Sequence, residues 1–161
     1  MTPHQPTIVV GVDGSLASIL ALRWAQVIAS VMNAGIRALT AWDFDIPFGS
    51  VTPTVPDPDR QAQRICSLTV ERAYGTSSPG KVAQAIRRGP AAKVLLDESL
   101  TAQLLILGSR GHSTLSDVLI GSVSTTVGRD AKCPVLIAYG TALPSTLWAH
   151  ADVEKLPTTD P

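Results

Sequence analysis

Two kinds of apolar pattern alternate along the chain and predict strands and helices in turn. Short apolar runs without a polar side are typical of strands buried on both faces of a sheet, whereas apolar residues repeated every three or four positions are typical of helices that cover such a sheet. The alternation predicts a doubly wound α/β fold, a five-stranded parallel sheet with helices on both faces. The predicted strands lie within 7–15, 36–42, 81–89, 104–107 and 134–139, and the predicted helices within 16–34, 60–74, 90–100 and 122–131.

The first predicted helix has the clearest pattern. Ser15 suits its N-cap and Gly35 its C-terminal stop. The third helix is predicted to begin with Pro90, at a position where the missing N–H costs nothing. The predicted buried side of the first helix comprises Leu16, Ile19, Leu20, Trp24, Val27, Ile28 and Val31, and its predicted exposed side comprises Arg23, Gln26 and Ser30. The predicted apolar face of the third helix comprises Ala92, Leu95, Leu96, Ser99 and Leu100.

Two segments fit neither pattern. Four prolines fall within residues 45–58, so this segment is predicted to be an irregular loop. Residues 141–161 show no periodicity, which predicts a flexible tail in which Trp148 is the residue suited to docking. The chain is therefore predicted to form one domain over 1–140, followed by a tail over 141–161.

Composition narrows the classes of function. The 161 residues are 45% hydrophobic and 16% charged, as expected for one domain with a well-filled core. Thirteen Lys and Arg balance thirteen Asp and Glu, so the net charge gives no indication of a nucleic-acid or membrane partner. Cys66 and Cys133 belong to no Cys or His cluster, which predicts two buried free thiols rather than a disulfide or a zinc site. No signal peptide or membrane-length apolar run is visible, so we expect a cytoplasmic protein.

The stretch "GSRGHSTLSDVLIGSVS" follows the most apolar strand and is rich in glycine and hydroxyl residues. In a doubly wound sheet, ligands bind beyond the carboxyl ends of the strands, where the strand order reverses. Glycines there expose backbone amides to an anion such as phosphate, and a helix N-terminus adds about half a positive charge. The residues predicted to form this anion site are Gly108, Arg110, Gly111, Gly121 and Ser122, with Ser124 as a further hydroxyl.

Two residues at neighbouring strand ends are predicted to complete a nucleotide site. Asp13, at the tip of the first strand, can accept hydrogen bonds from ribose hydroxyls or from an adenine edge. The alternative is that Asp13 caps the turn "VDGS" and binds nothing. The main chain of Ala41 can bond a purine, and its small side chain leaves room for a flat ring.

No catalytic residue is predicted. His112 is expected to be an exposed loop residue, and Asp117 alone does not make a metal site. The glycine motifs of P-loop NTPases and of dinucleotide dehydrogenases are absent, as is the residue pattern of receiver domains. At most, slow ATP hydrolysis is expected.

Several motifs resemble the universal stress protein family over about residues 7–140. These are "GVDGSLAS", "RRGPAAKVLLDES", "CPVLI" and the spacing Gly108-x-x-Gly111-(x9)-Gly121-Ser122. The resemblance implies the strand order 3-2-1-4-5 of the adenine nucleotide alpha hydrolase-like fold. It also implies a homodimer through the last strand, residues 134–139.

The resemblance further implies a stress-response protein that binds ATP, with AMP, ADP or cyclic AMP as alternatives and Mg²⁺ or Mn²⁺ accompanying ATP. Gln103 and the pair Thr125 and Thr126 depart from the acidic and basic residues usual in the family, which weakens the attraction for a triphosphate. A dimeric interaction scaffold with a vestigial site remains an alternative. Carried over by position, Asp13 and Ala41 would contact adenine and ribose, and Gly108, Gly111, Gly121, Ser122 and Val123 would contact the phosphates.

Overall fold

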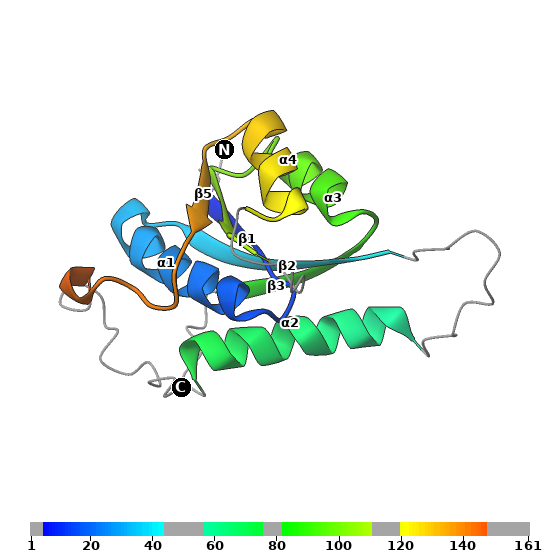
Figure 1. The fold of residues 1–161 in the computed structure, drawn as a ribbon, viewed down its shortest axis with the longest axis horizontal. Helices are drawn as coiled ribbons and strands as arrows, with labels where there is room; N and C mark the ends of the chain where they lie inside the picture. Colours follow the sequence, from blue (N-terminus) through cyan, green and yellow to red (C-terminus); the bar gives the residue numbers. More distant parts are fainter. Residues whose placement is uncertain (1–4, 44–56, 76–81, 111–119, 148–161) are drawn as a thin grey trace.

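A five-stranded parallel sheet forms the centre of the computed structural model, which describes residues 5–43, 57–75, 82–110 and 120–147 (Figure 1). The strands lie in the order β3-β2-β1-β4-β5 and every neighbouring pair is parallel, as predicted. Their bounds are β1 Thr7–Gly11, β2 Gly35–Trp42, β3 Val82–Arg88, β4 Leu104–Gly108 and β5 Val135–Ala138.

Helices cover both faces of this sheet, and each face has its own hydrophobic core. The helices α1 (Leu16–Met32) and α2 (Pro58–Tyr74) pack on one face, and α3 (Ala91–Glu98) and α4 (Ser122–Asp130) on the other (Figure 1). Successive side chains of a strand point to opposite faces, so Ile8 and Val10 of β1 enter the first core while Val9 enters the second. This two-sided burial explains why β1 and β4 consist of continuous apolar runs.

The ends of the helices differ in detail from the predictions. The helix α1 ends at Met32 and Asn33 is its C-cap, in the left-handed conformation with φ of 49°, while Gly35 already begins β2. The helix α2 begins inside the predicted loop, where the Asp57 side chain caps it by accepting from the Arg60 amide. Pro90 is the N-cap of α3 rather than its first residue, and Leu100 lies beyond the helix with 69% of its surface exposed.

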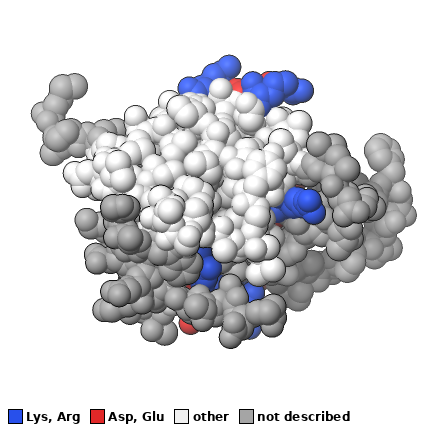
Figure 2. All heavy atoms as spheres, turned by 60° about the vertical axis from the view of Figure 1, so that its left-hand side comes forward, with Lys and Arg blue, Asp and Glu red and all other residues white. Residues whose placement is uncertain are grey.

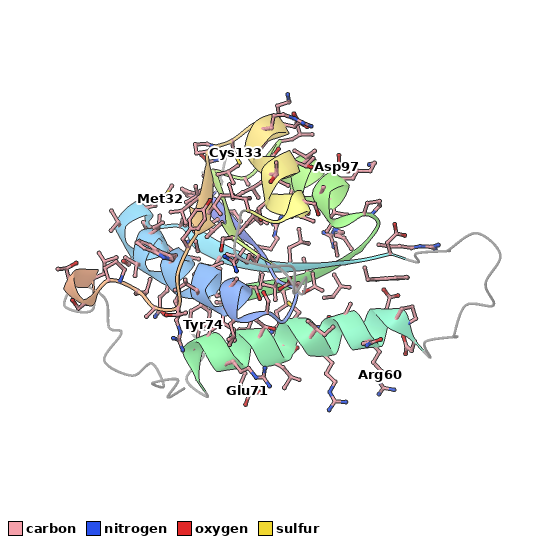
Figure 3. All side chains as sticks on the ribbon, in the orientation of Figure 1. Met32, Arg60, Glu71, Tyr74, Asp97 and Cys133 are labelled. Carbon is pink, nitrogen blue, oxygen red and sulfur yellow. The ribbon has the colours of Figure 1, made fainter. Side chains whose placement is uncertain are left out.

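The prediction that Arg23 lies on an exposed side of α1 is wrong. Arg23 is only 6% exposed, and its Nε donates to the carbonyl oxygen of Ala73 in α2. Tyr74, at the end of α2, donates its hydroxyl to the carbonyl oxygen of Leu22 in α1, while Arg60 and Glu71 point away from the sheet (Figure 3). Burial lowers the pKa of Arg23 and raises the pKa of Tyr74. The helix α1 is therefore covered by α2 as well as by the sheet.

The ends of α1 also differ from the predicted amphipathic pattern. Leu16 and Val31, both expected to be buried, are 76% and 85% exposed. Leu16 is the first and Val31 the penultimate residue of the helix. At these ends the apolar periodicity continues, but the side chains are no longer buried against the sheet. The predicted buried residues Ile19 and Leu20, nearer the middle, do lie in the core.

Part of the predicted tail packs against the domain. After β5 the chain continues beside α1 to a short 3-10 helix, η1 (Ser145–Leu147) (Figure 1). Leu143 is only 6% exposed and Leu147 packs against the same core as α1. Trp148 and the rest of the tail lie outside the described residues, as does most of the proline-rich loop 45–58.

Both cysteines are free thiols, as predicted. Cys66 is fully buried between α2 and β2, whereas Cys133 is only half-buried. Burial raises the pKa of each thiol, which keeps both protonated near neutral pH.

Gly108 is needed for close packing between β4 and the first turn of α1. A Cβ placed on Gly108 would lie 2.6 Å from the Ala17 Cβ and 2.7 Å from the Ala17 carbonyl carbon. Because the backbone of Ala17 cannot swing away as a flexible side chain would, only glycine fits here. Gly108, which is predicted from the sequence to form part of the anion site, is therefore also required by helix packing.

We predict opposite effects on stability for two glycine-to-alanine substitutions. Gly108→Ala should lower the free energy of unfolding by about 1–3 kcal/mol through overpacking. Gly128→Ala should raise it by about 1 kcal/mol, because Gly128 lies within α4 and an added Cβ meets nothing within 4 Å. Urea unfolding monitored by circular dichroism measures both, and a Gly108→Ala variant as stable as the parent would contradict the packing argument.

Candidate functional site

A cavity of about 300 Å³ opens at the carboxyl ends of β1 and β4. The chain lays β2 and β3 on one side of β1 and then returns to place β4 on the other side, so the strand order reverses at this point. The lining comes from the ends of three strands and the beginnings of three helices. It comprises Gly11, Val12, Asp13, Ser15, Ser18, Leu39, Ala41, Ala91, Leu95, Leu107, Gly108, Arg110, Gly121, Ser122, Val123 and Ser124.

The structure brings together nearly all of the predicted site residues. Seven of them line this one cavity, although they come from four separate parts of the chain. Gly111 lies outside the described residues, as do His112 and Asp117. The seven are Asp13, Ala41, Gly108, Arg110, Gly121, Ser122 and Val123.

Three helices begin at the cavity, which is lined by Ser15, the N-cap of α1, and by the first residues of α3 and α4, Ala91 and Ser122. The first amides of a helix have no partner within the helix and carry a partial positive charge. Ser15 caps α1 with its side chain, but within the described residues no side chain caps α3 or α4. The first-turn amides of α4 are therefore suited to receive an anion at the cavity wall.

Two hydrogen bonds hold the start of α4 against the end of β4. The amide of Gly121 donates to the carbonyl oxygen of Ser109 at 2.7 Å, and the hydroxyl of Ser124 donates to the carbonyl oxygen of Gly108 at 2.8 Å. Ser124 was a candidate for phosphate contact, but its hydroxyl proton is engaged by the backbone. Ser122, by contrast, is exposed and lies at the first position of the helix, with Gly121 as N-cap.

Asp13 forms the turn that the sequence offered as one alternative, and it also lines the cavity. Its Oδ1 accepts from the amide of Ser15 at 3.0 Å and from the hydroxyl of Ser15 at 2.6 Å, so the carboxylate does form the expected turn. The same residue lines the cavity. Asp13 and Arg110 are the two charged residues among the described lining residues, which places one charge of each sign there.

The apolar part of the cavity wall was not predicted. Val12, Leu39, Leu95 and Leu107 line it, together with the first residue of α3, Ala91. Strand alternation could have indicated Leu39, because it lies two residues before Ala41 and so points to the same face. The contribution of α3 depends on how that helix packs beside α4, which no local pattern reveals.

The described residues show neither a metal cluster nor a membrane span. Across the described ranges, His, Cys, Asp and Glu side chains do not gather in a group of three that could hold a metal ion. None of the helices in those ranges combines the length and the apolar character that crossing a membrane requires.

Comparison with known proteins identifies the family. The model of the universal stress protein family matches residues 6–138. The chain belongs to the universal stress protein family. A universal stress protein of Mycobacterium tuberculosis strain H37Rv is 36% identical over 140 residues, covering 84% of this chain and 46% of that protein. The chain thus spans about half the length of the curated relatives that it matches.

Solved structures agree with the fold. UspA from Lactobacillus plantarum superposes with a TM-score of 0.62 at 22% identity, covering 86% of this chain and all of that one. A universal stress protein in complex with cAMP superposes with a TM-score of 0.57 at 29% identity, covering 83% of this chain and 96% of that one. The predicted strand order 3-2-1-4-5 is therefore confirmed both by the structure and by its structural relatives.

We predict that two serines in the first turn of α4 differ in their effect on stability. Ser124→Ala removes a buried hydrogen bond and should lower the free energy of unfolding by about 1–2 kcal/mol. Ser122→Ala changes an exposed hydroxyl and should stay within about 0.5 kcal/mol of the parent. Thermal and urea unfolding of both variants provide the measurement. Equal losses would show that the bond to Gly108 does not anchor the helix.

Proposed function

We propose that this chain is a stress-response regulatory protein that binds an adenine nucleotide, ATP in the first place, in the cavity at the ends of β1 and β4. One observation carries the proposal: the N-terminus of α4, which no described side chain caps, opens onto a cavity that apolar side chains also line. Such a site suits a ligand that joins an anionic group to a flat apolar ring. The relative that was solved in complex with cAMP supports an adenine nucleotide.

The phosphates would lie against the start of α4. The amides of Ser122 and Val123 belong to its first turn, and the exposed Ser122 hydroxyl and the Arg110 guanidinium add donors beside them. Gly121 presents no side chain at the N-cap, so a phosphate oxygen can approach the helix end closely. Gly111 would extend this bare backbone into the neighbouring loop.

The adenine ring would lie against the end of β2. The carbonyl oxygen of Leu39 accepts from the amide of Val12, so it faces β1. Backbone groups alternate sides along a strand, so those of Ala41 face the same side, beyond Gly11, the last residue of β1. The main chain of Ala41 therefore supports recognition of the edge of a purine, and Asp13 supports recognition of the ribose hydroxyls.

A divalent ion would bind only together with the nucleotide. Asp13 is the single carboxylate among the described lining residues. Mg²⁺ or Mn²⁺ would therefore be held chiefly by oxygens of the phosphates, as is usual for Mg²⁺ bound with nucleotides. We propose binding as the function rather than hydrolysis, because the described residues at the phosphate end supply donors and no general base.

We also propose a homodimer through β5. This strand is an outer edge of the sheet, its residues carry no charge, and Tyr139 beside it is 58% exposed. Figure 2 shows a broad face without charged side chains, with Lys and Arg gathered at its rim. An edge strand without protecting charges is prone to pair with another strand, which supports a second copy of the chain as the partner.

The substitution that tests nucleotide binding is Gly121→Val. A branched side chain at the N-cap would occupy the space of the phosphate, so the affinity for ATP should fall by more than about tenfold. The backbone of Gly121 has φ of −60° and ψ of 160°, which valine adopts without strain, so the fold should survive with a loss of about 1 kcal/mol for the poorer cap.

The matched control is Gly128→Val, the same change on the exposed side of α4, where an added Cβ meets nothing within 4 Å. Isothermal titration of parent and variants with ATP, AMP and cyclic AMP gives the affinities. If the parent binds none of them, the nucleotide proposal is wrong and the scaffold alternative gains support. Equal binding by Gly121→Val and parent would place the nucleotide elsewhere.

The dimer is tested by Ile137→Lys. A lysine in the centre of β5 would bring two like charges together across the paired edges, so this variant should be monomeric by light scattering. Leu68→Lys is the control, because Leu68 is 42% exposed on α2 and adds the same charge away from β5. A parent that is itself monomeric, or a dimeric Ile137→Lys variant, would refute pairing through this strand.

A further inference from the structure

The hydrogen bonds of Ser15 link the start of α1 to the wall of the cavity. Its hydroxyl donates to Asp13 Oδ1 at 2.6 Å and accepts from the amide of Ser18 at 3.2 Å. Its own amide also donates to Asp13 Oδ1, at 3.0 Å. Because a hydroxyl has one proton and two lone pairs, one side chain serves both as the cap of α1 and as a donor to Asp13.

We infer that Ser15 is a positioning residue that holds the Asp13 carboxylate in the orientation required to accept from a ribose hydroxyl; this inference rests on the proposed nucleotide site. The last torsion of an aspartate side chain is broad and roughly two-fold, so the carboxylate group has little orientation of its own. Two donors from one residue to the same oxygen fix that torsion. The ligand then meets a carboxylate that is already oriented, which reduces the entropy lost on binding.

The local backbone makes this arrangement possible. Gly14 has a φ of 88°, in the region that favours glycine, and this turn brings Ser15 back over the side chain of Asp13. A carboxylate offers about four acceptor positions, so it can accept from more donors than the two of Ser15. Asp13 and Ser15 both line the cavity, so the oriented group lies where the ligand would bind.

Ser15→Ala would also weaken the cap of α1, so the experiment must separate this structural effect from positioning. The probes are ATP and its 2′,3′-dideoxy analogue, which lacks both ribose hydroxyls. Ser15→Ala should weaken binding of ATP about fivefold, the value of one hydrogen bond, and leave binding of the analogue nearly unchanged. Ser15→Thr keeps the hydroxyl and should restore the affinity for ATP. Ser30→Ala is the control, because Ser30 lies on the same helix and its hydroxyl donates to the carbonyl oxygen of Val27 in that helix.

A double-mutant cycle tests whether Ser15 acts through Asp13. In the Asp13→Ala background, Ser15→Ala should cause no further loss of ATP affinity, although it should still lower the unfolding temperature. Additive losses, equal losses for ATP and the analogue, or parent-like ATP binding by Ser15→Ala would each overturn the positioning role. If the parent protein binds neither nucleotide, the proposed function fails first, and the role of Ser15 fails with it.

Discussion

The attachment of α4 to the end of β4 is the constraint on which the candidate site depends. The bonds from Gly121 to Ser109 and from Ser124 to Gly108 join a helix N-terminus to a central strand at two points. They hold the first turn of α4 at the switch point of the sheet. Because Gly108 also lies directly against Ala17, the start of α1 is brought to the same place. The backbone of Gly108 and Ser109 thus sets the positions of the N-termini of both α1 and α4.

The arrangement of the residues that line the cavity follows from the packing of α1 and α4 against β4. The helix ends supply amides and hydroxyls, whereas Val12 just after β1, Leu39 of β2 and Leu107 of β4 supply apolar surface. An apolar lining with a few polar groups is typical of small-molecule sites, because the apolar part supplies affinity and the polar groups set the orientation. Members of the family share this fold, but the residues that line the cavity here decide what this chain can hold.

Much of the fold could be predicted from the sequence because burial on both faces leaves a strong pattern. The continuous apolar run of β4 is typical of an inner strand and the mixed run of β3 of an edge strand, which is where the structure places them. Periodicity failed where a residue meets a partner far along the chain. Arg23 is buried because α2 covers it, and Leu143 is buried because the chain after β5 returns to α1. Neither contact leaves a pattern in the neighbouring sequence from which it could be predicted.

In the candidate site, likewise, the positions of residues could be predicted from the sequence but the reasons for them could not. Glycines after β4 and an aspartate after β1 can be recognised from position alone, since parallel strands bring their carboxyl ends to one edge. The sequence did not reveal why each residue is there. Gly108 is required by the backbone of Ala17, and the hydroxyl of Ser124 is used to anchor its helix. These roles depend on distances between elements, which spacing along the chain does not determine.

The most direct measurement is a crystal structure of the protein soaked with ATP and Mg²⁺. The account predicts density for a phosphate group within hydrogen-bonding distance of the Ser122 and Val123 amides, with the adenine ring beside Ala41. A nucleotide bound elsewhere, or a cavity filled by the protein's own atoms at the start of α4, would contradict it.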